Sequence, residues 1–81
     1  MFINKNKDGK NNICGKNIAA IRTSMGLSQR QLSNLLQLNG LDIDKNAIQR
    51  IEAGKRFVTD IELHCFSRTL GKTLDELLEI D

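Results

Sequence analysis

The stretch LSQRQLSNLLQLNGLDIDKNAIQRIEAGKR, residues 27–56, decides the fold of this chain. Apolar residues recur in it at helical spacing in two short runs. A polar link containing a glycine separates the runs, and another glycine follows the second run. We therefore expect two short helices joined by a turn.

The second run predicts a helix with two unlike faces. Asp44 is a good N-cap for a helix from Lys45 to about Ala53, and Gly54 is a good residue to end it. The apolar residues share one face: Ala47, Ile48 and Ile51. The outward face has no acid and displays four hydrogen-bonding side chains: Lys45, Asn46, Gln49 and Arg50. Arginine pairs with guanine, asparagine and glutamine with adenine, and lysine with guanine or phosphate, so these four are the predicted base contacts.

The first run predicts a helix that begins after Ser28, because Gln31 three residues later completes a capping box. Its buried stripe consists of three leucines: Leu32, Leu35 and Leu36. Gln29 and Arg30 lie in its first turn, where free backbone N–H groups and the helix dipole favour an anion such as a DNA phosphate. The alternative for Gln29 is a solvated polar side chain.

The link between these helices, residues 37–43, has the sequence QLNGLDI. Asn39 and Gly40 are expected to end the first helix, and Leu41 and Ile43 to pack beneath the link. The two helices should then behave as one unit.

A helix from Gly15 to about Met25 is predicted before this pair, with Gly26 as its stop. Its apolar stripe recurs at helical spacing: Ile18, Ile21 and Met25. Arg22 lies beside that stripe, where a charge requires a partner from another element.

Two further helices are predicted after the pair. Thr59 or Asp60 caps one that ends before Gly71, and Thr73 caps a short last one. Their core stripes are Leu63, Phe66, Ser67 and Leu70 in the first, and Leu74, Leu77 and Leu78 in the last. A weaker apolar line consists of Val58, Ile61 and Cys65. That line is either a self-association surface or the edge of the domain.

Length and composition favour one small domain, because 81 residues are too few for a catalytic cleft between subdomains. Residues 1–14 are rich in Asn and Lys, and we expect a flexible basic arm there, with the folded domain at 15–81. Cys14 and Cys65, without a signal peptide or membrane-spanning run, indicate a reduced cytoplasmic protein in which a disulfide between them is disfavoured. His64 is the single histidine and neither cysteine has ligand spacing with it, so no enzyme, metal site or cofactor is expected.

Charge is unevenly distributed along the chain, although the total is only +2. Residues 1–15 carry a net charge of +2 and residues 16–56 a net charge of +4. Residues 57–81 carry two basic and six acidic side chains, a net charge of −4. This polarity is typical of a protein that docks in one orientation on a polyanion, although small surfaces can also be uneven by chance.

Three blocks of sequence resemble the lambda repressor and Cro type of helix-turn-helix domain, also called the XRE family. They are GKNIAAIRTSMGLSQRQLS, AIQRIEAGKR and LGKTLDELL, and they stand in the family's order between about residues 15 and 80. The resemblance implies an all-α, compact five-helix domain in which the second and third helices form the helix-turn-helix.

The resemblance also implies roles for individual residues. Gln29 would contact the sugar-phosphate backbone and help to brace a base contact, while the outward residues of the third helix would face the major groove. Arg22 would pair with Glu52 as a structural ion pair rather than act in catalysis. Lys55 and Arg56 follow the third helix and, with Gln29 and Arg30, are the predicted DNA backbone contacts. The segment QLNGLDID is about five residues longer than is usual in the family, which leaves the angle between the two helices open.

The leading functional prediction is a sequence-specific transcriptional regulator of duplex DNA, a repressor, acting as a homodimer on half-sites about 34 Å apart. Dimerisation would use Val58, Ile61, Cys65 and the C-terminal helix. The alternative is a protein-interaction module, such as an antitoxin, that binds a protein partner through its last two helices.

Overall fold

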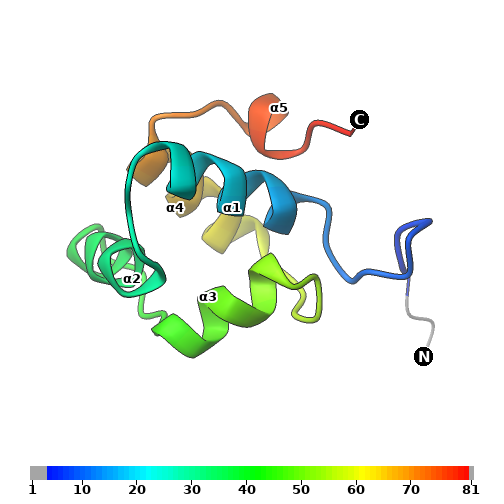
Figure 1. The fold of residues 1–81 in the computed structure, drawn as a ribbon, viewed down its shortest axis with the longest axis horizontal. Coiled ribbons are helices and arrows are strands. Elements are labelled where there is room, and N and C mark those ends of the chain that lie inside the picture. Colours follow the sequence, from blue (N-terminus) through cyan, green and yellow to red (C-terminus); the bar gives the residue numbers. More distant parts are fainter. Residues whose placement is uncertain (1–3, 81) are drawn as a thin grey trace.

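The computed structural model describes residues 4–80, and every regular element in that range is a helix. The helices are α1 (Cys14–Ser24), α2 (Gln29–Leu38), α3 (Lys45–Glu52), α4 (Asp60–Leu70) and α5 (Leu74–Leu77). α1 lies in the middle of the bundle, with α3 on one side and α5 on the other (Figure 1). The predicted five-helix, all-α architecture is confirmed.

Side-chain caps fix where the last four helices begin. The capping residues are Ser28, Asp44, Thr59 and Thr73, and each accepts a hydrogen bond from a backbone N–H in the first turn. In α2, α4 and α5 the third helical residue returns a bond to the cap, which completes a capping box. The open choice between Thr59 and Asp60 is resolved in favour of Thr59.

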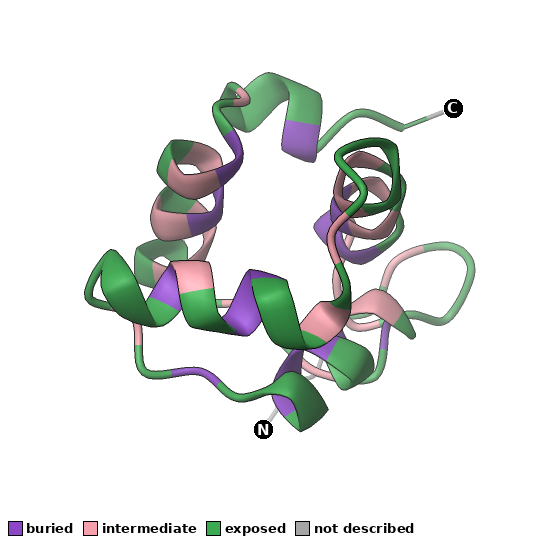
Figure 2. Cartoon of the chain, turned by 60° about the vertical axis from the view of Figure 1, so that its left-hand side comes forward, coloured by how far each residue is buried: buried purple, intermediate pink, exposed green. Residues whose placement is uncertain are grey.

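The core is built from apolar side chains that all five helices turn inward. Its largest fully buried members are Ile18, Leu32, Leu36, Ile48, Ile51, Phe66 and Leu77. Figure 2 shows these inward faces as buried, whereas the outer faces of the helices are exposed. Burial of these side chains is the main favourable contribution to folding.

The prediction that three leucines of the last helix close the core is wrong for two of them. Leu77 is fully buried, but Leu74 is 44% and Leu78 is 40% exposed. The reason is that α5 has only four residues, about one turn, so only one side of it reaches the core.

The predicted apolar line of Val58, Ile61 and Cys65 does not form one continuous surface. Val58 and Cys65 are partly buried and pack against the core, while Ile61 is 73% exposed. Cys14 is buried, and both cysteines are free thiols.

The long link between α2 and α3 is held in place by side chains at its two ends. Asn39 donates through Nδ2 to the backbone oxygen of Leu35 at 3.0 Å and to Oγ1 of Thr69 at 3.2 Å. Gly40 adopts a φ of +91°, which favours glycine, and Ile43 is buried in the core. Asn39 therefore anchors the start of the link to α4 as well as to α2.

Candidate nucleic-acid interface

The outward face of α3 is exposed, while its inward face is fixed in the core. Asp44 accepts a hydrogen bond from the N–H of Ala47 at 2.8 Å, which caps the helix. The four predicted base-contacting side chains are all exposed: Lys45, Asn46, Gln49 and Arg50. Within residues 4–80 none of these four side chains forms a hydrogen bond or an ion pair. Their donors and acceptors are therefore available to an external partner.

A shallow hollow runs along this face toward the end of the helix. It is lined by Asp44, Asn46, Gln49, Arg50, Ala53 and Lys55. Lys55 is exposed, and its N–H donates to the backbone oxygen of Arg50 at 2.9 Å, which keeps it close to the helix end. The hollow thus joins three of the predicted base contacts to one predicted backbone contact.

Arg22 of α1 and Glu52 of α3 form the expected ion pair. Nε of Arg22 lies 2.7 Å from Oε2 of Glu52, and Nη2 lies 3.1 Å from Oε1. The side chains are 17% and 8% exposed, respectively. The hydrogen bonds that Arg22 donates to Glu52 raise the pKa of the Arg22 guanidinium above its ordinary value. Glu52 is therefore turned away from the outward face of α3.

Gln29 takes part in the same cluster. Its Nε2 donates to Oε1 of Glu52 at 3.0 Å, so the amide is not the solvated side chain that was one of the two alternatives. Arg30, the other predicted backbone contact in the first turn of α2, is exposed. The cluster connects α1, the N-terminus of α2 and the C-terminal turn of α3.

Arg56 has a partner that sequence reasoning missed. Its Nη1 lies 3.0 Å from Oε1 of Glu62, and its Nη2 lies 2.9 Å from Oε2. These hydrogen bonds raise the pKa of Arg56 and lower that of Glu62. Glu62 also belongs to the Thr59 capping box, and that motif is the signal that could have identified it. Lys55 and Arg56 thus differ in how available their charges are to an external partner, because Arg56 already has a carboxylate partner.

The segment before α1 lies against the end of α3. Residues 1–3 of the predicted flexible arm lie outside the described residues. Asn11 and Asn12 hydrogen-bond to the backbone of the last turn of α3 and of the loop after it. No local sequence pattern predicts these contacts, because their partners are about 40 residues away in the chain.

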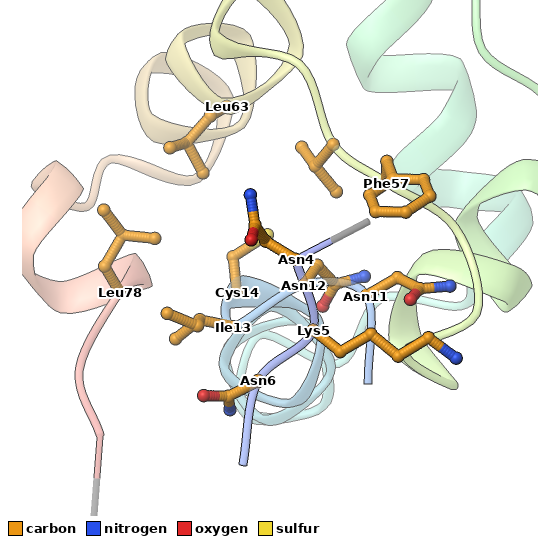
Figure 3. Close-up of a pocket in the computed structure, with 11 residues that line it drawn as sticks. Asn4, Lys5, Asn6, Asn11, Asn12, Ile13, Cys14, Phe57, Leu63 and Leu78 are labelled. Carbon is orange, nitrogen blue, oxygen red and sulfur yellow. The ribbon is translucent and has the colours of Figure 1, made fainter. Parts of the chain in front are cut away.

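A pocket lies beneath this segment (Figure 3). Ile13, Val58, Leu63 and Leu78 give it an apolar lining, and the asparagines of the segment border it. Cys14 also lines it, and burial raises the pKa of this thiol to about 11, so the thiolate is not formed near neutral pH. Among residues 4–80 no three His, Cys, Asp or Glu side chains are grouped to hold a metal ion. In the same range no helix is both long and apolar enough to cross a bilayer.

Comparison with known proteins places this geometry in a family. Residues 18–77 match the helix-turn-helix family. The fold is similar to the crystal structure of the restriction-modification controller protein C.AhdI from Aeromonas hydrophila, with a TM-score of 0.68 and 26% sequence identity. That alignment covers 79% of this chain and 86% of the controller protein. No curated protein matches the sequence. The chain therefore belongs to the helix-turn-helix family, as an XRE-type member with the lambda repressor-like fold.

Proposed function

We propose that this protein is a sequence-specific DNA-binding transcriptional regulator, a repressor, that reads the major groove with α3. The observation that carries the proposal is the outward face of α3, whose four polar side chains have no partner within residues 4–80. The similar fold of a controller protein supports the regulatory role. The repressor role is carried over from the lambda repressor and Cro type that the sequence resembles.

Base contacts in this proposal come from the outward residues of α3. Arg50 is suited to bidentate pairing with guanine O6 and N7, and Asn46 and Gln49 to pairing with adenine N6 and N7. Lys45 lies at the first helical position, where it reaches either a guanine or a phosphate. The Arg22–Glu52 pair keeps the acid of the helix away from the DNA.

Backbone contacts come from both ends of the helix-turn-helix. Arg30 and the free N–H groups of the first turn of α2 approach one phosphate, and Lys55 approaches another beyond the end of α3. Gln29 contributes by bracing Glu52 through one N–H of its Nε2, and the second N–H of that amide is left to donate to a phosphate of the DNA backbone. Arg56 is the weakest of the four, because Glu62 neutralises it.

Dimerisation on a two-fold DNA site is the second part of the proposal, with half-sites about 34 Å apart. Exposed apolar side chains suited to a contact between two copies belong to α4, α5 and the residues after α5: Ile61, Leu74, Leu78 and Ile80. Val58 and Cys65 contribute less, because both are partly buried against the core of their own protomer. α5, which carries Asp75 and Glu76, lies on the opposite side of α1 from α3 (Figure 1), which favours an orientation with the basic side toward DNA.

A selection from randomised duplexes with the purified protein tests the proposal. We expect one enriched motif with two-fold symmetry. Variants with substitutions on the outward face of α3 should lose the preference for guanine or adenine at individual positions of that motif. Binding to a random duplex at two salt concentrations provides the control, because phosphate contacts make affinity fall steeply with salt. No enrichment and no affinity at low salt would instead favour the protein-interaction module, for which the exposed Ile61 on α4 is the motivating observation.

A further inference from the structure

The segment before α1 folds back on itself as a closed turn. The N–H of Asn6 donates to the backbone oxygen of Lys10 at 2.9 Å, and the N–H of Gly9 donates to the backbone oxygen of Asn6 at 2.9 Å. Oδ1 of Asp8 accepts from the N–H of Lys10 at 3.0 Å. Gly9 has a φ of +80°, which such a turn requires of a glycine. The turn therefore fixes where its lysines leave the backbone.

Two asparagines then attach this turn to the end of α3. Nδ2 of Asn12 donates to the backbone oxygens of Ile51 at 3.0 Å and Arg56 at 2.8 Å. Oδ1 of Asn12 accepts from the N–H of Gly15 at 2.9 Å. One side chain thus joins the start of α1, the last turn of α3 and the loop after it.

Asn11 adds two further contacts to the same loop. Its N–H donates to the backbone oxygen of Gly54 at 2.8 Å, and its Nδ2 donates to that of Lys55 at 3.0 Å. Together Asn11 and Asn12, which we call the asparagine clamp, satisfy backbone oxygens at the C-terminal end of α3. Helix ends leave such oxygens without intrahelical partners.

Lys10 lies directly against the loop that the clamp holds. A Cβ built on Gly54 would come within 2.6 to 2.9 Å of the Cβ, Cγ and Cδ atoms of Lys10, so the stem of Lys10 crosses Gly54. Lys55 follows Gly54 directly in the chain. Neither ammonium group forms an ion pair within residues 4–80. Asp8 is the acid of this turn, and its bond is to a backbone N–H.

We propose that the clamped segment is part of the DNA-binding surface, with Asn12 as a positioning residue that holds Lys10 beside Lys55. Lys10 then contacts a DNA phosphate next to the one that Lys55 contacts. A phosphate is the partner that fits, because the stem of Lys10 is held against Gly54, next to Lys55 of the hollow along α3, and neither ammonium group is paired within residues 4–80. This inference rests on the proposed function.

The test measures affinity for a duplex of fixed sequence over a range of salt concentrations. Each phosphate contact contributes about 0.9 to the slope of log affinity against log salt. We expect Lys10→Gln to reduce that slope by about one contact and leave the melting temperature unchanged. Lys72→Gln is the matched control, since Lys72 directly precedes the cap of α5, and α5 lies on the other side of α1 from α3 (Figure 1). It should change neither quantity.

The role of the clamp is tested with Asn12→Ala and the double variant with Lys10→Gln. If Asn12 acts by holding Lys10, Asn12→Ala lowers the slope as Lys10→Gln does, and the double variant shows no further reduction. A slope for Lys10→Gln equal to that of the wild type would overturn the inference while leaving the proposed function intact. Additive losses in the double variant would overturn the positioning role of Asn12. If Asn12→Ala does not fold, the slope of Lys10→Gln alone decides whether Lys10 contacts a phosphate. A wild-type protein without affinity for DNA would overturn the proposed function and this inference together.

Discussion

Arg22 donates two hydrogen bonds to Glu52, from Nε to Oε2 at 2.7 Å and from Nη2 to Oε1 at 3.1 Å. The contact joins α1 to the last turn of α3. Gln29 donates to the same Oε1 at 3.0 Å, so three elements meet on one carboxylate. Without these partners a carboxylate would stand close to the surface proposed to face DNA, where it would be repelled.

Breaking this pair should destabilise the fold. Glu52→Gln keeps the shape of the side chain but leaves the Arg22 charge without its partner. Exposed pairs contribute about 1 kcal/mol or less and breaking a fully buried one costs about 3 to 5 kcal/mol, so for this largely but not fully buried pair we expect a loss of about 2 to 3 kcal/mol. Urea unfolding monitored by circular dichroism measures it. Lys72→Gln, at an exposed pair with Glu76, is the control and should leave the midpoint unchanged. Equal midpoints for Glu52→Gln and the wild type would contradict the prediction.

Arg50 and Lys55 should differ in how they affect DNA binding. Arg50→Ala should cost about 1 to 3 kcal/mol on the selected site and relax base preference at one position, because a bidentate base contact is lost. Lys55→Ala should weaken binding to all sequences by a similar factor, because a phosphate contact carries no sequence information. Titrations of both variants against the selected and a random duplex measure this difference. Equal losses on both duplexes for Arg50→Ala would show that the reading face is wrongly assigned.

Gly15 of α1 packs directly against the backbone of α3. A Cβ built there would be 2.0 Å from the backbone oxygen of Ile51, so neither backbone can accommodate it without moving. Gly15→Ala should therefore destabilise the protein by about 1 to 3 kcal/mol, as overpacking does, although alanine is the better helix former. Thermal unfolding measures it, with Ala20→Gly on the exposed side of α1 as the reverse substitution. Both changes should lower the melting temperature. A melting temperature above that of the wild type for Gly15→Ala would refute the close approach of Gly15 to the backbone of Ile51.

Local sequence signals were sufficient for most of the helix boundaries. Ser28 with Gln31, Asp44 and Thr73 marked helix starts correctly, because a capping bond joins residues only two or three apart in the chain. The stripe at Ala47, Ile48 and Ile51 predicted the buried face of α3, and so which residues of that helix would be exposed. Both signals are complete within one or two turns of a helix.

Contacts between residues far apart in the chain could be predicted from the sequence only where the family resemblance implied them. Arg22 and Glu52 were paired on that ground, whereas the bonds from Asn12 to Ile51 and Arg56 had no signal, since an asparagine near a chain terminus usually indicates a loop. The exposure of Leu74 and Leu78 was missed for another reason. Periodicity cannot show that a helix is only one turn long and offers one side to the core.

Arg56 and Glu62 should make stability depend on pH in the acidic range. The hydrogen bonds from Arg56 hold the folded-state pKa of Glu62 below its ordinary value of 4.5. A carboxyl with a depressed folded-state pKa stabilises the fold fully above its unfolded-state value, and this contribution is lost as the pH falls through the folded-state pKa. Unfolding free energy should therefore decrease as the pH is lowered below about 4.5, and Glu62→Gln should flatten the decrease. Arg56→Gln, which leaves the Thr59 capping box in place, should flatten it partially. Urea midpoints measured at a series of pH values test this, and identical pH dependence in the wild type and both variants would show that the pair does not control acid stability.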